Sequence, residues 1–335
     1  IIGAKSSNLD SFFFPEDTLR YLLAQNAEGC DLTVIEGVMG YYDGLGLTST
    51  RASTYEVAQK TDSPVVLVVN ARGAALSVLA AVQGFLTFLP DNHITGVILN
   101  GCTAMSYAPL ARELESRFKI KACGYLPRLS DCALESRHLG LVTAQEVTDL
   151  REKMQRLAQA AEKSIDLDAL LSIANGAPRL SFTPPQLPQA GEPVRIGVAK
   201  DRAFCFVYDD SLALLQKLGA KLVPFSPICD PALPENLHGL YLPGGYPELY
   251  AEALSRNKTM LESVRAAVSS GLPCIAECGG FMYLTQAIGS FPMAGVLPGA
   301  CFDNQKLTRF GYITLTAQKD NLLCRAGARL PAHEF

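Results

Sequence analysis

The sequence predicts an α/β protein with two domains, each a mostly parallel sheet covered by helices. Its length of 335 residues suits two domains better than one. Apolar runs rich in Val, Ile and Leu alternate with helical segments in both halves, as in parallel sheets buried on both faces. A proline-rich stretch separates the halves and is typical of a linker. We therefore place the first domain at residues 1–175, the linker at 176–193 and the second domain at 194–335.

The first half begins its alternation with a strand expected at residues 31–37, "DLTVIEG". Two further apolar runs predict strands at residues 63–71 and 94–101. Helical spacing then predicts helices in the segments 74–89, 107–118 and 149–175. Strands that alternate with helices in this way predict a parallel sheet.

The second half repeats the alternation. A strand is expected at residues 194–200, followed by a helix and a strand within 209–227 and a strand at 239–245. One long amphipathic helix is predicted over residues 250–271. The stretch "LPCIAECGGFMYL" at 272–284 then combines a short apolar strand, a glycine turn and the start of a helix.

Composition excludes several classes of protein. The net charge is −4 and no run of Lys or Arg occurs, which argues against a nucleic-acid partner. No apolar segment reaches the roughly 18 residues needed to cross a membrane. Ten cysteines without a C-x-x-C pair indicate free thiols in a reducing cytoplasm, and four unpaired histidines argue against a zinc site.

Both ends of the chain are abrupt. The sequence begins without methionine at "IIGAKSSNLDSFFFP" and ends at "PAHEF". We expect the natural protein to extend beyond both ends.

Cys278 lies where the predicted strand bends into a helix. A helix N-terminus offers free N–H donors and partial positive charge, which stabilise a thiolate nucleophile. The N–H of Gly279 would then point toward a developing oxyanion. The alternative is that Cys278 is a small core residue, as most cysteines are.

A glycine pair, Gly244 and Gly245, ends the strand predicted at 239–245. Ligands of open α/β sheets bind at the carboxyl ends of strands, and glycines let backbone N–H groups approach them closely. The alternative is an ordinary turn.

An acidic loop, "VIEGVMGYYDG", occupies residues 34–44. A carboxylate at a strand end followed by glycines suits Mg²⁺ bound together with phosphate, so Glu36 is the metal candidate. Asp43 is the candidate for contact with a substrate. For each acid the alternative is a helix cap or a solvated loop residue.

Together, "GGYPE" and "ECGGFMYL" resemble the class I glutamine amidotransferase domain of Cys-His type found in enzymes that amidate corrin precursors. The rest of the chain resembles the cobyrinic acid a,c-diamide synthase family and, more distantly, dethiobiotin synthetase. The resemblance covers nearly the whole chain and rests on the segments 8–15, 34–44, 63–73, 96–102, 124–128, 135–142 and 198–215.

The resemblance implies a ligase that forms C–N bonds, using ATP, Mg²⁺ and glutamine to amidate the a and c carboxylates of a cobyrinic acid-type tetrapyrrole. Cys278 would attack glutamine, with Gly244, Gly245 and Gly279 around the oxyanion. Asn100, at a strand end, would contact adenine or else cap a turn. A homodimer is the expected assembly, and His138 in the segment 135–142 is expected to be structural.

The catalytic base is expected from the family ending G-H-E-F-H-Y-S, whose second histidine is the expected activator. Here Ala332 replaces the glycine, His333 is the first histidine, and the sequence stops at Phe335. His333 is therefore the fallback base, with a surface or turn residue as its alternative.

Two departures from the family pattern stand out. The phosphate-binding motif G-x-x-x-x-G-K-[ST], which the family carries near its N-terminus, occurs nowhere in this sequence. Ser211 also stands where the family commonly has Asn.

Two alternative functions remain at this stage. The same chemistry would serve hydrogenobyrinic acid or nickel-sirohydrochlorin, because the ring metal need not touch these motifs. A regulatory ATPase similar to MinD, joined to a pseudo-glutaminase, would have no need for a thiol at position 278.

Overall fold

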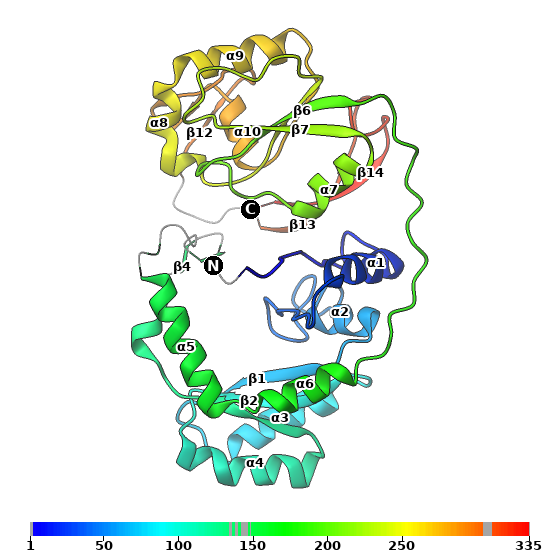
Figure 1. Cartoon of the computed structure of the whole chain (residues 1–335), viewed down its shortest axis with the longest axis vertical. Coiled ribbons are helices and arrows are strands. Elements are labelled where there is room, and N and C mark those ends of the chain that lie inside the picture. Colours follow the sequence, from blue (N-terminus) through cyan, green and yellow to red (C-terminus); the bar gives the residue numbers. More distant parts are fainter. Residues whose placement is uncertain are drawn as a thin grey trace. The chain divides into compact units, whose positions relative to one another are not determined.

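The computed structural model describes residues 3–133, 136–137, 140–141, 147, 149–303 and 310–334. The chain forms two compact units, Ile1–Pro185 and Gln186–Phe335, each with its own parallel sheet and covering helices (Figure 1). The predicted α/β class is therefore confirmed, and the division falls inside the segment expected to be a linker. None of the helices in the described ranges combines the length and hydropathy that a bilayer crossing requires.

The sheet of the first unit has three parallel strands in the order β1-β2-β3. These strands are β1 (Val65–Asn70), β2 (Ile94–Asn100) and β3 (Lys121–Leu126), the last of which the sequence analysis missed. The buried core includes residues of β1 and β2 together with residues of α3 (Ser77–Phe88) and α4 (Ala104–Phe118). On β2, an added Cβ at Gly96 would lie 2.9 Å from Ile173 of the last helix of the unit, so that helix packs directly on the strand.

The remaining elements of this unit are mostly helical. They are α1 (Glu16–Ala27), α2 (Thr54–Thr61), η1 (Ser130–Cys132), β4 (Ser136–Arg137), β5 (Gly140–Leu141), α5 (Leu150–Ser164) and α6 (Leu167–Asn175).

The strand predicted at residues 31–37 is wrong. These residues form no regular secondary structure and pair with no strand in the described part of the chain, and Val34 is 81% exposed. An apolar run becomes a strand only where a neighbouring edge supplies hydrogen-bond partners, and sequence pattern does not report that edge.

The helical segment 149–175 is interrupted after Ser164. Ile165 forms an isolated bridge with Gly124, and the Asp166 N–H donates to the carbonyl of Cys123 at 2.9 Å. The Asp166 carboxylate then accepts from the Ala169 N–H at 2.9 Å and caps α6.

The second unit is built on a four-stranded parallel sheet in the order β7-β6-β8-β9. Its strands are β6 (Val194–Ala199), β7 (Ala220–Phe225), β8 (Gly239–Leu242) and β9 (Cys274–Ala276), and its helices are α7 (Asp209–Lys217), η2 (Pro247–Tyr250), α8 (Ala251–Arg256), α9 (Lys258–Ser269) and α10 (Gly279–Leu284). Short strands β10 (Ala287–Ile288), β11 (Phe291–Pro292) and β12 (Ala300–Cys301) follow, and β13 (Gly311–Thr316) pairs antiparallel with β14 (Arg329–Glu334).

The single helix predicted over residues 250–271 is wrong, because the chain breaks at Asn257 into α8 and α9. The Asn257 carboxamide oxygen accepts from the Met260 N–H and caps α9. Its Nδ2 donates to the carbonyls of Pro227 and Asp230 at 2.9 and 2.8 Å. The same side chain thus starts a helix and fastens the loop after β7.

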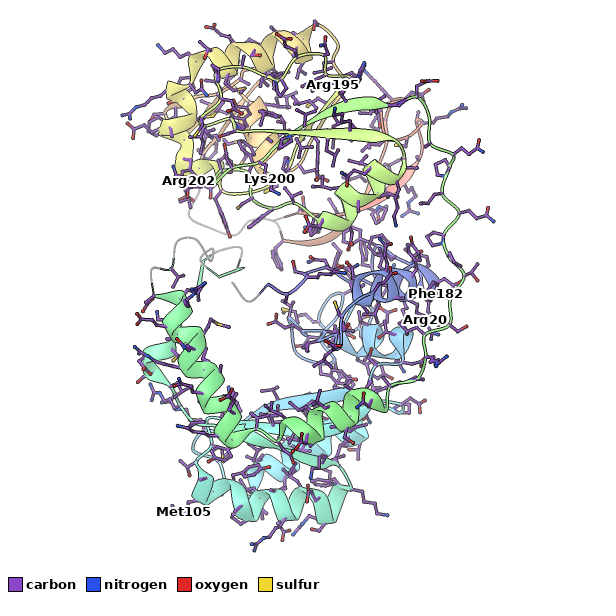
Figure 2. All side chains as sticks on the ribbon, in the orientation of Figure 1. Arg20, Met105, Phe182, Arg195, Lys200 and Arg202 are labelled. Atoms are coloured by element: carbon purple, nitrogen blue, oxygen red, sulfur yellow. The ribbon has the colours of Figure 1, made fainter. Side chains whose placement is uncertain are left out.

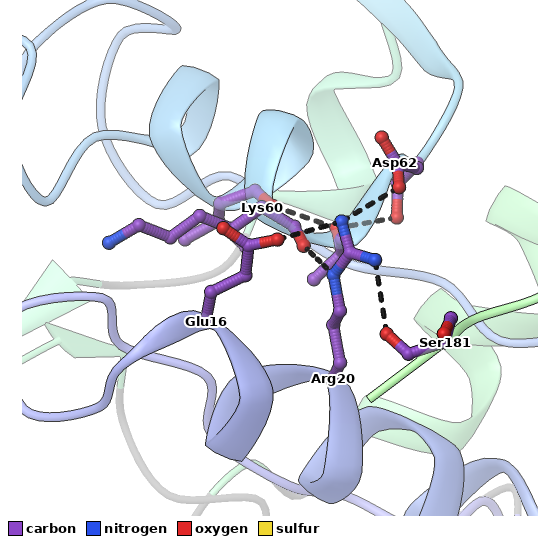
Figure 3. A network of polar contacts seen from close by, with 8 residues as sticks. Glu16, Arg20, Lys60, Asp62 and Ser181 are labelled. Atoms are coloured by element: carbon purple, nitrogen blue, oxygen red, sulfur yellow. Dashed lines mark hydrogen bonds and ion pairs between the residues drawn. The ribbon is translucent and has the colours of Figure 1, made fainter. Parts of the chain in front are cut away.

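Arg20 of α1 ties together three segments of the first unit (Figure 3). Its guanidinium donates to the carbonyls of Lys60 and Ser181 at 2.5 and 3.1 Å, and it pairs with the carboxylates of Asp62 and Glu16 at 2.8 and 2.9 Å. Only 15% of the Arg20 side chain is exposed, whereas the side chains of Glu16 and Asp62 are 54% and 43% exposed, so the bonds to the backbone carbonyls contribute together with ion pairs that water partly screens. The beginning of the expected linker is therefore fastened to α1 rather than free.

We expect Arg20→Ala to lower the free energy of unfolding by about 2 kcal/mol, because it leaves two carbonyls and two carboxylates without their charged donor. Arg117→Ala is the matched control: Arg117 pairs with Glu113 on the exposed side of α4 and should cost no more than about 0.5 kcal/mol. Denaturant unfolding of both variants measures the difference, and equal losses would contradict the role of the network.

Candidate functional site

The carboxyl edge of the second sheet gathers the candidate residues. Strands β6, β8 and β9 are parallel, so their last residues meet at one edge. In Figure 2, Arg195 marks the beginning of β6, whereas Lys200 and Arg202 mark the segment just after its end. Gly244 lies two residues after β8 and Cys278 two residues after β9. Ligands of open α/β sheets bind at this edge.

Cys278 occupies a sharp strand-to-helix turn. Its φ is 49° and its ψ is −110°, a conformation that few residues other than glycine adopt, and it immediately precedes α10. The turn is possible because the next residues carry no side chain: an added Cβ would lie 2.7 Å from Pro247 at Gly279 and 2.0 Å from the Leu242 carbonyl at Gly280. This geometry is that of a nucleophile elbow.

The glycine pair lies directly against the thiol. An added Cβ at Gly244 would lie 3.5 Å from the Cys278 sulfur, and at Gly245 it would lie 2.1 Å from the Ala203 carbonyl. Gly245 also has a φ of 157°, which residues with a side chain rarely adopt, so both the steric space and the backbone conformation require glycine there. The structure thus brings the two motifs together.

Burial raises the pKa of the Cys278 thiol above its ordinary value. The N–H groups of Gly245 and Gly279 hydrogen bond to the sulfur and lower this pKa in part, while the charges of Glu248 and Glu277 raise it. The expected stabilising donors are present, but the net shift opposes ionisation. By comparison, burial raises the pKa of the neighbouring Cys274 to about 11. A base is therefore needed to generate the Cys278 thiolate near neutral pH.

The loop after β6 supports the glycine pair. The Asp201 carboxylate accepts from the Ala203 N–H at 2.8 Å and from the Ser226 hydroxyl at 2.8 Å. The Ala203 carbonyl accepts from the Tyr246 N–H at 3.0 Å, and the Phe206 N–H donates to the Gly244 carbonyl at 3.1 Å. Asp201 holds the loop that fixes residues 244–246 over the thiol.

The two histidines of the second unit occupy different positions. His333 is exposed on β14, opposite Tyr312 of β13. The His238 ring nitrogen accepts from the Arg195 N–H at 3.0 Å, next to the first residues of β6 and β8. His238 is thus at the amino edge of the sheet, away from the carboxyl edge that carries Cys278.

The candidates of the first unit lie in loops or at a strand end. Glu36 and Asp43 are exposed in irregular backbone, and the Asp43 N–H closes a turn on the Gly40 carbonyl at 2.9 Å. Asn100 is exposed at the carboxyl end of the central strand β2. The turn after β1 is capped by the Asn70 carboxamide, which accepts from the Arg72 N–H. His138 lies outside the described residues.

The oxygen and nitrogen donors near Glu36 bear on its predicted role as a Mg²⁺ ligand. Within the described ranges, no group of three or more His, Cys, Asp or Glu side chains could form a metal cage. Mg²⁺ is commonly held by one or two carboxylates together with substrate phosphates, which a single exposed carboxylate such as Glu36 fits.

Sequence reasoning missed the side chains that support the elbow. Asp201 lies in the segment 198–215 and Glu277 directly precedes the cysteine, so both lie within segments that the sequence analysis names. Their partners, Ser226 and Tyr241, come from other strands and their loops, and only the fold pairs them.

Comparison with known proteins agrees with this geometry. Residues 195–335 match the family described as the CobB/CobQ-like glutamine amidotransferase domain, and residues 15–136 match an AAA domain family. The cobyrinate a,c-diamide synthase of Caldanaerobacter subterraneus is 39% identical over 98% of this chain and 74% of its own length. The synthases of Listeria monocytogenes and Clostridium acetobutylicum are 39% and 38% identical, each over 100% of this chain and 75% and 76% of their own lengths.

The match extends through both units, and the amidotransferase match contains the elbow, the glycine pair and the supporting loop. The chain therefore belongs to the cobyrinate a,c-diamide synthase family, which are ligases that carry a glutamine amidotransferase domain.

Proposed function

We propose that this enzyme amidates the a and c carboxylates of cobyrinic acid in cobalamin biosynthesis, with glutamine as nitrogen donor and ATP as the activating co-substrate. The observation that carries the proposal is the thiol of Cys278, held at a strained elbow within hydrogen-bond reach of two glycine N–H groups. The ring substrate and the positions amidated are those named for the related synthases.

Ammonia is released in the second unit. The Cys278 thiolate attacks the side-chain amide carbon of glutamine, and the carbonyl oxygen becomes an oxyanion that the N–H groups of Gly245 and Gly279 stabilise. When the carbon–nitrogen bond breaks, the nitrogen takes a proton and leaves as ammonia. Water then hydrolyses the thioester, which yields glutamate and regenerates the thiol.

The family ending implies that the base for the thiol is its second histidine, which would follow Phe335, and His333 is the fallback, because the other described histidine of this unit, His238, lies at the opposite edge of the sheet. Neutral imidazole would accept the thiol proton and later return it to the leaving nitrogen. If His333→Ala left the rate of glutamine hydrolysis unchanged, the fallback assignment to His333 would be wrong.

The first unit is proposed to activate the carboxylate, since an ionised carboxylate is a poor electrophile without a leaving group. Transfer of the terminal phosphate of ATP to the carboxylate gives an acyl phosphate and ADP. Ammonia then displaces phosphate and forms the amide. Asn100 is proposed to contact adenine, Asp43 the tetrapyrrole, and Glu36 would hold Mg²⁺, which neutralises phosphate charge.

We expect Cys278→Ser to lower glutamine-dependent amidation by at least about 1000-fold, because a serine hydroxyl is far harder to ionise than a thiol. Amidation with free ammonium salt should persist, since the synthetase step does not use the thiol. Assays of amide formation with either nitrogen source measure both rates.

Cys229→Ser is the matched control, because Cys229 is an exposed free thiol in the same unit and should be dispensable. Loss of both activities in Cys278→Ser would contradict the proposed division of labour between the units.

We expect Asp43→Asn to raise the KM for the tetrapyrrole by about tenfold, because the loss of one charged hydrogen bond is comparable to that factor. The KM for ATP should change little. Asp31→Asn, an exposed acid at the start of the same irregular segment, is the control. Steady-state kinetics with each substrate varied in turn provide the test, and unchanged kcat and KM for the tetrapyrrole would reject the role of Asp43.

A further inference from the structure

The residue next to the proposed nucleophile in the chain is a glutamate. Glu277 is the residue before Cys278, and its negative charge acts on the thiol together with that of Glu248 from η2. A like charge close to a group that must become anionic disfavours its ionisation. Any protein group that fixes or shares the charge of Glu277 therefore affects how readily the thiolate forms.

Tyr241 of β8 is such a group. Its hydroxyl donates a hydrogen bond to Glu277 Oε2 at 2.7 Å. Tyr241 is only 9% exposed and lies opposite Ile275 in the β8–β9 pair, so its position is set by the sheet. The Glu277 N–H donates to the Leu242 carbonyl at 3.0 Å, which fixes the backbone of the partner.

The hydroxyl keeps its proton over a wide pH range. Burial raises the pKa of Tyr241, and the hydrogen bond and charge of Glu277 raise it further, as does nearby Tyr208. Tyr241 is therefore a neutral donor wherever the thiol titrates. A charge-assisted hydrogen bond of this length is also among the stronger side-chain contacts.

We propose that Tyr241 and Glu277 form a positioning pair, in which the tyrosine hydroxyl fixes the glutamate carboxylate and shares its charge so that Cys278 can ionise. The inference deepens the proposed function, because it concerns the nucleophile of the same site. Tyr241 acts on the sulfur through Glu277 and is a positioning residue rather than a catalytic one.

This arrangement predicts a dependence between two substitutions. Tyr241→Phe leaves the Glu277 charge without its donor, so the pKa of Cys278 should rise by roughly 0.5 to 1 unit. Glu277→Gln removes the charge and should lower that pKa. The double variant Tyr241→Phe/Glu277→Gln should have the same Cys278 pKa as Glu277→Gln alone, because no glutamate charge remains for the tyrosine to share.

The test is the pH dependence of Cys278 alkylation by iodoacetamide, since the thiolate is the reacting form. Fragment-ion mass spectrometry of the purified protein separates Cys278 from Cys274 on the same peptide. Tyr283→Phe is the matched control: it removes a buried hydroxyl that has no hydrogen-bond partner among the described residues of this unit, and it should leave the profile unchanged. Exposed Cys229 reports whether general reactivity has changed.

The inference is supported if Tyr241→Phe shifts the Cys278 profile to higher pH only when Glu277 is present. It is overturned if the shift is the same in the Glu277→Gln background, which would mean that Tyr241 acts by packing, or if Tyr241→Phe causes no shift. Alkylation needs no glutamine, so it tests the inference separately from the proposed function. If Tyr241→Phe shifts the Cys278 profile only when Glu277 is present, but the protein releases no ammonia from glutamine, then the proposed function is wrong and the inference still holds.

Discussion

The backbone conformation of Cys278 is the constraint on which the amidotransferase unit depends. A positive φ at a residue other than glycine costs on the order of 1–3 kcal/mol and persists only where the surroundings enforce it. Here the enforcement comes from tight packing of Gly279 on Pro247 and of Gly280 on the Leu242 carbonyl. This strained conformation places the Cys278 sulfur at the carboxyl edge of the sheet. An unstrained residue at the start of a helix would not hold its side chain in this position.

At Cys278, backbone groups and side chains have opposite effects on the ionisation of the thiol. Burial and two carboxylates oppose the thiolate, while the N–H groups of Gly245 and Gly279 favour it. The same donors would serve an oxyanion, and in a site sheltered from water such fixed dipoles stabilise charge strongly. A thiol that is protonated at rest and ionised only when a base takes its proton is also protected from unwanted oxidation.

The fold class, the order of most elements and the pairing of the cysteine with the glycine pair followed from the sequence, because apolar alternation and short glycine motifs are local signals. Strand β3 and three further features did not follow. Residues 31–37 have a strand composition, but no described strand pairs with them. Asn257 and Asp166 divide predicted helices because their side chains cap new helices, and Asn257 also bonds to a distant loop. The contact between Tyr241 and Glu277 joins two strands and is set by their register.

The central claim is that Cys278 forms a covalent bond with glutamine, and trapping that intermediate tests it most directly. The protein would be mixed with glutamine, quenched in acid within the first turnover and digested for mass spectrometry. The account predicts a glutamyl thioester on Cys278 that disappears when the reaction is allowed to run to completion. Ammonia release without any adduct at Cys278, or with the adduct on another cysteine, would contradict it.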